Sequence, residues 1–83
     1  MTTFETTDLY LACALKMALH LPFPEIQPNG RFSTFRFHVD PTEAQRVAEK
    51  FYNSALPLDA REFSMTLRDL KALLLQKRGV KTK

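Results

Sequence analysis

The segment from residue 29 to residue 53 constrains the fold more than any other part of the chain. It opens with the pair Asn29-Gly30, continues as an alternating strand over residues 31–39, and passes into a helix at Asp40-Pro41. Asn tolerates and Gly favours the left-handed backbone of a tight hairpin turn. Asp as the helix cap, with Pro at the first helical position, is typical of a helix start. The sequence therefore predicts a hairpin strand that leads directly into an amphipathic helix.

Successive side chains of a strand point to opposite faces, so this strand divides into two sets. The set that we assign to the core is Ser33, Phe35, Phe37 and Val39. The set that we assign to an outer face, at least partly exposed to water, is Phe32, Thr34, Arg36 and His38.

A largely apolar helix is predicted upstream of the hairpin. Thr6 or Thr7 can cap it through its hydroxyl, and Asp8 then lies in the first turn, where a carboxylate interacts favourably with the helix dipole. Almost every side of this helix is apolar, which indicates burial on most faces. Its end is set by residues 21–24, because the two prolines there favour extended backbone and predict a short strand over residues 23–27.

The last predicted helix opens at the capping pair Asp59 and Glu62 and ends at Gly79. Phe4 lies in a short β-compatible stretch, and the sequence leaves open whether it adds a third strand. The predicted fold is α+β: a helix, a two-stranded antiparallel hairpin and two helices packed on one face of the sheet. A chain of 83 residues is too short for two cores, so we predict one domain over residues 1–78 and a flexible basic tail over residues 79–83.

The charge of the chain is concentrated at its C-terminus. The formal net charge is +3, and the basic cluster that accounts for it is Lys77, Arg78, Lys81 and Lys83. No apolar run approaches the roughly 20 residues that span a bilayer, and Glu5 and Asp8 stand where a secretory signal is positively charged. We therefore predict a cytoplasmic protein without a membrane partner.

No set of residues in the sequence indicates a reaction or a cofactor. His20 and His38 lack orienting partners for acid or base catalysis, and Cys13, the single cysteine, lies in an apolar helix where a thiol is usually inert. The Cys and His spacing fits no metal site. We expect no enzyme activity, no metal and no cofactor. Because a single cysteine cannot form an internal disulfide and no metal site is expected, dimerisation is the remaining means of stabilising so small a domain.

The outer face of the strand is the best candidate for a contact surface. It combines aromatic, hydroxyl and cationic groups, as surfaces that bind nucleic acids do. An ordinary solvated sheet face has the same composition, so both interpretations stay open. The candidate contact residues, including the terminal cluster that can bind phosphates, are Arg31, Phe32, Thr34, Arg36, His38, Lys77, Arg78, Lys81 and Lys83.

Two resemblances follow from these motifs. The run from Thr6 to Ala12, the strand end Phe35-Arg36-Phe37, the segment Glu49–Asn53 and the closing helix with Phe63 and Leu67 resemble a family of short bacterial and phage proteins classed as a domain of unknown function. That resemblance covers nearly the whole chain and implies an architecture without an activity.

Residues 32–78, a strand followed by two helices, are similar to the ribbon-helix-helix DNA-binding module, in which the paired strands of a dimer enter the major groove. The resemblance implies that Thr34, Arg36 and His38 read bases and that the amides near Asp40 meet phosphate. Our main hypothesis is nevertheless a binding module that contacts another macromolecule. A protein, including a second copy of the chain, is favoured as the partner, and dimeric DNA binding through residues 31–38 is the alternative.

Overall fold

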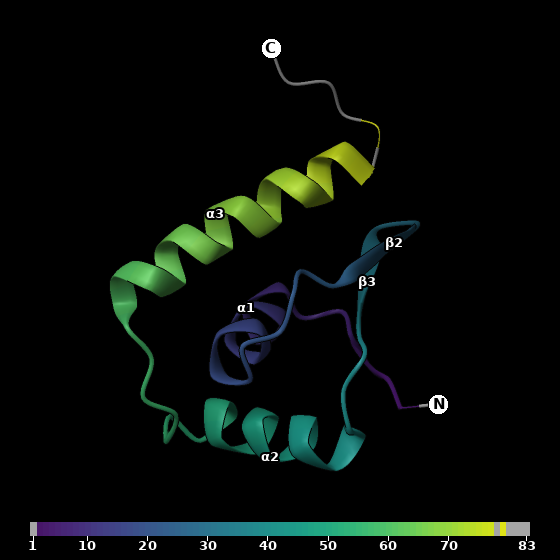
Figure 1. The fold of residues 1–83 in the computed structure, drawn as a ribbon. Coiled ribbons are helices and arrows are strands. Elements are labelled where there is room, and N and C mark those ends of the chain that lie inside the picture. Colours follow the sequence, from purple (N-terminus) through teal and green to yellow (C-terminus); the bar gives the residue numbers. More distant parts are fainter. Residues whose placement is uncertain (1, 78, 80–83) are drawn as a thin grey trace.

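The structure, a computed structural model, describes residues 2–77 and Gly79 (Figure 1). In chain order its elements are β1 (Phe4–Thr6), α1 (Leu9–Ala18), β2 (Glu25–Asn29), β3 (Phe32–Phe37), α2 (Pro41–Tyr52) and α3 (Ala60–Lys77). The predicted α+β class is confirmed. The predicted tail lies, apart from Gly79, outside the described residues.

The three strands form one antiparallel sheet in the order β1-β3-β2. The hairpin strand β3 pairs with the segment just before it, as predicted, and the stretch at Phe4 does add a third strand. In the resulting register Arg36 lies opposite Glu5 on β1 and opposite Glu25 on β2. Both edges of β3 are therefore occupied within the same chain.

The hairpin turn lies one residue later than the sequence suggested. Asn29 is the last residue of β2 and pairs with Phe32, so the loop consists of Gly30 and Arg31. Gly30 has φ +64°, which fits a type II′ turn, where only the first central residue needs positive φ. Gly30 is that first central residue, and Asn29 keeps the extended backbone of a strand residue. The first hairpin strand accordingly covers residues 25–29 and not 23–27.

Helix α1 begins and ends at residues that differ from those predicted. Its cap is Asp8, whose Oδ1 accepts hydrogen bonds from the backbone N–H groups of Tyr10 at 2.9 Å and Leu11 at 3.2 Å. The prediction of Thr6 or Thr7 as the cap is wrong: Thr6 ends β1, and its Oγ1 accepts the N–H of Asp8. The helix closes at Ala18 because His20 adopts φ +53°, three residues before the predicted end.

The other two helices open as predicted. Asp40 caps α2 by accepting the N–H of Thr42, with Pro41 at the first helical position. Asp59 caps α3 by accepting the N–H groups of Arg61 and Glu62. Both caps are local, so the sequence was sufficient to find them.

Helix α1 is the centre of the molecule. Its five consecutive residues Leu11–Leu15 are buried, and α2 and α3 pack on different sides of it, as Figure 1 shows. The small residues Ala12, Cys13 and Ala14 allow this close approach. The sheet contributes one face to the same core, and α3 also contacts β2. The buried apolar side chains from outside α1 are Ile26, Phe35, Phe37, Ala44, Val47, Ala48 and Leu70.

Candidate functional site

The outer face of the sheet is centred on Arg36, and its cations are paired. Arg36 Nε lies 2.8 Å from Glu5 Oε2, and Arg36 Nη1 lies 3.6 Å from Glu25 Oε1. His38 Nε2 lies 3.2 Å from Glu25 Oε2. The cause is the register, which places one glutamate on each side of Arg36.

This pairing changes the electrostatics expected for the face. Two carboxylates beside one guanidinium leave these three side chains with a formal net negative charge. Exposed ion pairs of this kind contribute only about 0 to 1 kcal/mol each to stability. They nevertheless compete with any phosphate for Arg36. The sequence did not reveal that Glu5 and Glu25 pair with Arg36. Glu5 lies on β1, a strand that the sequence left undecided, and Glu25 is placed by a hairpin turn that lies one residue later than predicted.

The predicted contact residues separate into groups. Thr34, Arg36 and Lys77 line a hollow of about 580 Å³ beside β2. Arg31 and Phe32 line a different hollow at the hairpin tip. His38 borders a small hollow of about 40 Å³ beside residues 21–24. The remaining three predicted residues, Arg78, Lys81 and Lys83, lie outside the described part of the chain.

The hollow at the hairpin tip has a volume of about 350 Å³ and is lined mainly by apolar residues. We call it the hairpin-tip hollow; its lining residues are Thr7, Leu9, Arg31, Phe32, Ser33, Phe35, Leu74 and Leu75. Phe32 is 66% exposed and Leu75 is 38% exposed. Their side chains come from β3 and α3, which meet here beside the start of α1.

The open edge of β2 has little capacity to pair with another strand. Pro28 has no N–H, so it cannot belong to a residue pair that exchanges hydrogen bonds with β3. Hydrogen-bonded and non-hydrogen-bonded pairs alternate along an antiparallel strand, so the backbone N–H of Ile26, two residues away, also points away from β3. The edge therefore offers the N–H of Ile26 with a proline two residues away on each side, Pro24 and Pro28. Prolines on edge strands limit pairing with further strands. A partner at the β2 edge of this sheet must therefore be bound mainly through side chains.

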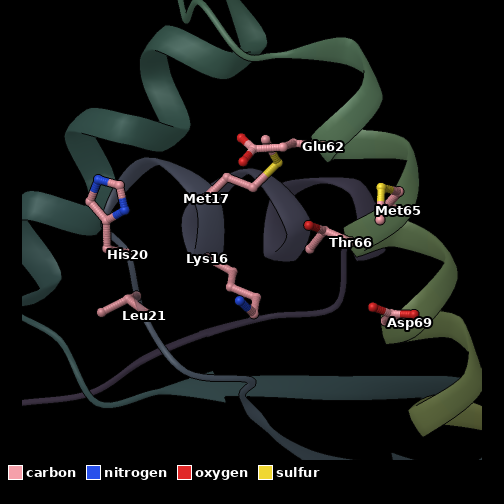
Figure 2. A pocket seen from close by; sticks show the side chains of 8 residues that line it. All are labelled: Lys16, Met17, His20, Leu21, Glu62, Met65, Thr66 and Asp69. Atoms are coloured by element: carbon pink, nitrogen blue, oxygen red, sulfur yellow. The ribbon is translucent and has the colours of Figure 1, made fainter.

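A second surface feature, a cleft of about 520 Å³ between α1 and α3, was not predicted (Figure 2). Lys16 and His20 lie on the α1 side, and Glu62 and Asp69 lie on the α3 side, with Thr66 between them. Among the described residues no ion pair spans the cleft, and the Lys16 ammonium instead lies 4.5 Å from the centroid of the Phe23 ring. The available signal was the spacing of Glu62 and Asp69, which are seven residues apart on α3 and therefore share one helix face. Lys16 lies on α1, whereas His20 lies beyond the end of that helix.

Among the described residues, two side chains have displaced pKa values, and neither lines one of these hollows. Burial raises the pKa of the Cys13 thiol to about 11, and Cys13 Sγ donates a weak hydrogen bond to the backbone oxygen of Phe63 at 3.5 Å. The thiol is therefore protonated at neutral pH, and the prediction of a buried packing residue is confirmed. A hydrogen bond to Asp8 raises the pKa of Tyr52 to about 12.

The described residues contain neither a metal-binding cluster nor a membrane-spanning helix. Within residues 2–77 and Gly79, no group of three or more His, Cys, Asp or Glu side chains is placed to hold a metal ion. Over the same residues, no helix has the length and apolar character that crossing a membrane requires.

Comparison of the chain with protein-family models, with curated proteins and with solved structures finds no match. The two resemblances noted in the sequence therefore stay predictions. For the ribbon-helix-helix resemblance the sheet adds one geometric condition. A ribbon built from β3 of two copies requires β1 or β2 to leave β3 first, because both edges of β3 are occupied.

Proposed function

We propose that this protein is a non-enzymatic binding module of the cytoplasm that contacts another protein. The observation that carries the proposal is the hairpin-tip hollow, where Phe32 stands 66% exposed at the rim. A single exposed apolar residue is ordinary. Here Phe32 and Leu75 border a concave surface with Leu9, Phe35 and Leu74, and this combination of an aromatic rim and an apolar floor is typical of binding sites for protein side chains.

Peptide display against the full chain tests the proposal. We expect the wild-type protein to select peptides whose binding is lost in Phe32→Ser, because the rim of the hollow loses its aromatic surface. Met65→Ser is the matched control, since Met65 is a large apolar residue that is 51% exposed in the α1–α3 cleft. Selection of no peptide, or of peptides that bind Phe32→Ser as well as the wild type, would contradict the proposal.

DNA binding by a dimer through residues 31–38 is the second candidate, favoured by the grouping of Thr34, Arg36 and Lys77 around one hollow. It ranks lower because Glu5 and Glu25 compete for Arg36. Mixed-sequence duplexes at low salt separate the two candidates. Under the DNA hypothesis affinity falls steeply with added salt and Arg36→Ala weakens it. The absence of any duplex binding at low salt eliminates this candidate.

A further inference from the structure

We infer that the protein segment bound in the hairpin-tip hollow is acidic: it inserts an apolar side chain and pairs a neighbouring carboxylate with Arg31. The inference rests on the proposed function and specifies the partner of the same site. It follows from the charge of the rim, the shape of the hollow and the protection of the sheet edge.

The first step is the state of Arg31. Among the residues that the structure describes, it is the only ionisable one in the lining of the hollow, and none of them contributes a carboxylate. Among the described residues Arg31 has no ion pair, whereas Arg36, on the same strand hairpin, lies close to two glutamates. A guanidinium at the rim of an apolar hollow can pair with an incoming carboxylate through two parallel hydrogen bonds. Arg31 is therefore available to a partner, and Arg36 is not.

The second step is the charge near α3. Lys77 follows Leu75 by two residues, and the other three basic residues of the C-terminal cluster lie within eight residues of Leu75 along the chain. The positive charge of Lys77, at the end of α3, attracts an acidic segment over roughly the 8 to 10 Å Debye length of physiological salt. Such attraction mainly raises the association rate and selects partners by charge.

The third step is the apolar part of the contact. Leu9, Phe35 and Leu74 contribute apolar side chains to the lining of the hollow, whose volume is about 350 Å³. Binding energy in such contacts is concentrated in one or a few apolar anchors that leave water completely. A Leu or aromatic side chain of the partner fits this requirement, with Phe32 and Leu75 at its sides.

Two other ways of using this surface are less compatible with the molecule. A peptide strand that pairs with β2 could accept the N–H of Ile26, but Pro24 and Pro28 on either side have no N–H to offer. An isologous contact between two copies places the same patch on both sides, so two surfaces that each carry Arg31 and the basic end of α3 would bring like charges together. A different, acidic protein segment meets neither obstacle.

The experiment uses two peptide libraries with the same fixed Leu or Phe anchor, one flanked by Asp and Glu and the other by Lys and Arg. We expect the wild-type chain to prefer the acidic library and the affinity of the selected peptides to fall with salt. Arg31→Gln should weaken acidic peptides by about tenfold, the loss expected for one charge-assisted contact. Arg31→Glu should reverse the preference toward the basic library.

The matched control is Arg46→Glu, which makes the same charge change at an exposed residue of α2 outside the lining of the hollow. Circular dichroism checks that each variant is folded. Equal binding of acidic and basic peptides that still requires Phe32 overturns the inference and leaves the proposed function standing. If neither library yields a binding peptide, or if binding does not depend on Phe32, both the inference and the proposed function are wrong.

Two further outcomes identify another occupant. A concentration-dependent mass in sedimentation that Phe32→Ser abolishes assigns the hollow to a second copy and overturns the inference. Peptide binding that appears only when the chain is truncated after Gly79 assigns the hollow to the protein's own C-terminal residues, with the same consequence.

Discussion

At the scale of single residues, Asp8 connects two helices that the sequence does not bring together. Its Oδ1 caps α1, while its Oδ2 accepts a hydrogen bond of 2.6 Å from the Tyr52 hydroxyl at the end of α2. The two residues are 44 positions apart, so no local pattern could reveal the contact. The bond requires the protonated phenol, which is why the pKa of Tyr52 rises from 10.0 to about 12.

Tyr52→Phe tests this contact. Because a hydrogen bond to a charged acceptor contributes more than a neutral one, we expect a loss of about 1 to 2 kcal/mol in the free energy of unfolding at neutral pH. The folded pKa of Tyr52 lies above the unfolded one, so the contribution is complete below pH 10 and is lost as the pH rises through about 12. Urea denaturation of both proteins from pH 7 to pH 12 measures the difference. Cys13 is present in both, so its own titration cancels.

Tyr10→Phe is the control for this measurement, since Tyr10 is also exposed and its hydroxyl has no hydrogen bond in the described part of the chain. It should leave the free energy of unfolding nearly unchanged at every pH. A Tyr52→Phe protein as stable as the wild type at pH 7, or a difference that persists undiminished at pH 12, would contradict the role assigned to Asp8.

At the scale of secondary-structure elements, the end of α1 depends on the backbone of His20. Its φ is +53°, and the Leu21 N–H then donates to the Lys16 oxygen at 3.0 Å, which closes the helix. Residues with a Cβ are strained in this conformation by about 1 kcal/mol. His20→Gly should therefore raise the free energy of unfolding by up to about 1 kcal/mol, as measured by thermal or urea denaturation. His20→Ala removes the imidazole and keeps the strain, so a gain in Ala equal to that in Gly would refute the backbone explanation.

The hairpin turn gives a second prediction at this scale. A Cβ added at Gly30 would meet no atom within 4 Å, but the residue has φ +64°, so substitution there is penalised by backbone conformation and not by a clash. Gly30→Val should lower the free energy of unfolding by about 1 to 2 kcal/mol. Asn29→Ala should have little effect, because Asn29 is an extended strand residue. The opposite ranking in urea denaturation would restore the turn position suggested by the sequence.

The successes and errors of sequence interpretation follow from how local each signal is. Asp40 and Asp59 were correctly predicted as caps because a cap bonds to residues two or three positions away. The end of α1 at His20 was missed because no Gly or Asn marks it. The outer face was identified by its alternation, yet the glutamates that neutralise Arg36 became visible only with the register of three strands. The hairpin-tip hollow combines three elements, and no single segment predicts it.

At the scale of the whole molecule, α1 lies at the centre of the core, and α2, α3 and β1 pack against it. The chain has one cysteine, which is free and buried, so no disulfide within the chain supports the fold. Stability must come from packing around α1, where the sheet, α2 and α3 converge. Chains of this size are stable by only about 5 to 10 kcal/mol, so the loss of one central side chain consumes a large part of the total.

The last prediction separates the core from the binding surface. Leu15 is fully buried at the centre of α1, whereas Leu75 is 38% exposed at the rim of the hollow. Leu15→Ala should lower the free energy of unfolding by about 2 to 5 kcal/mol, because it leaves a cavity that the surrounding elements cannot fill. Leu75→Ala should cost less than about 1 kcal/mol and should instead weaken the peptides selected through Phe32. Urea denaturation and peptide binding, measured on both variants, decide the matter. If Leu75→Ala destabilises the fold as much as Leu15→Ala does, the rim belongs to the core, and the apolar surface assigned to a partner is needed for folding itself.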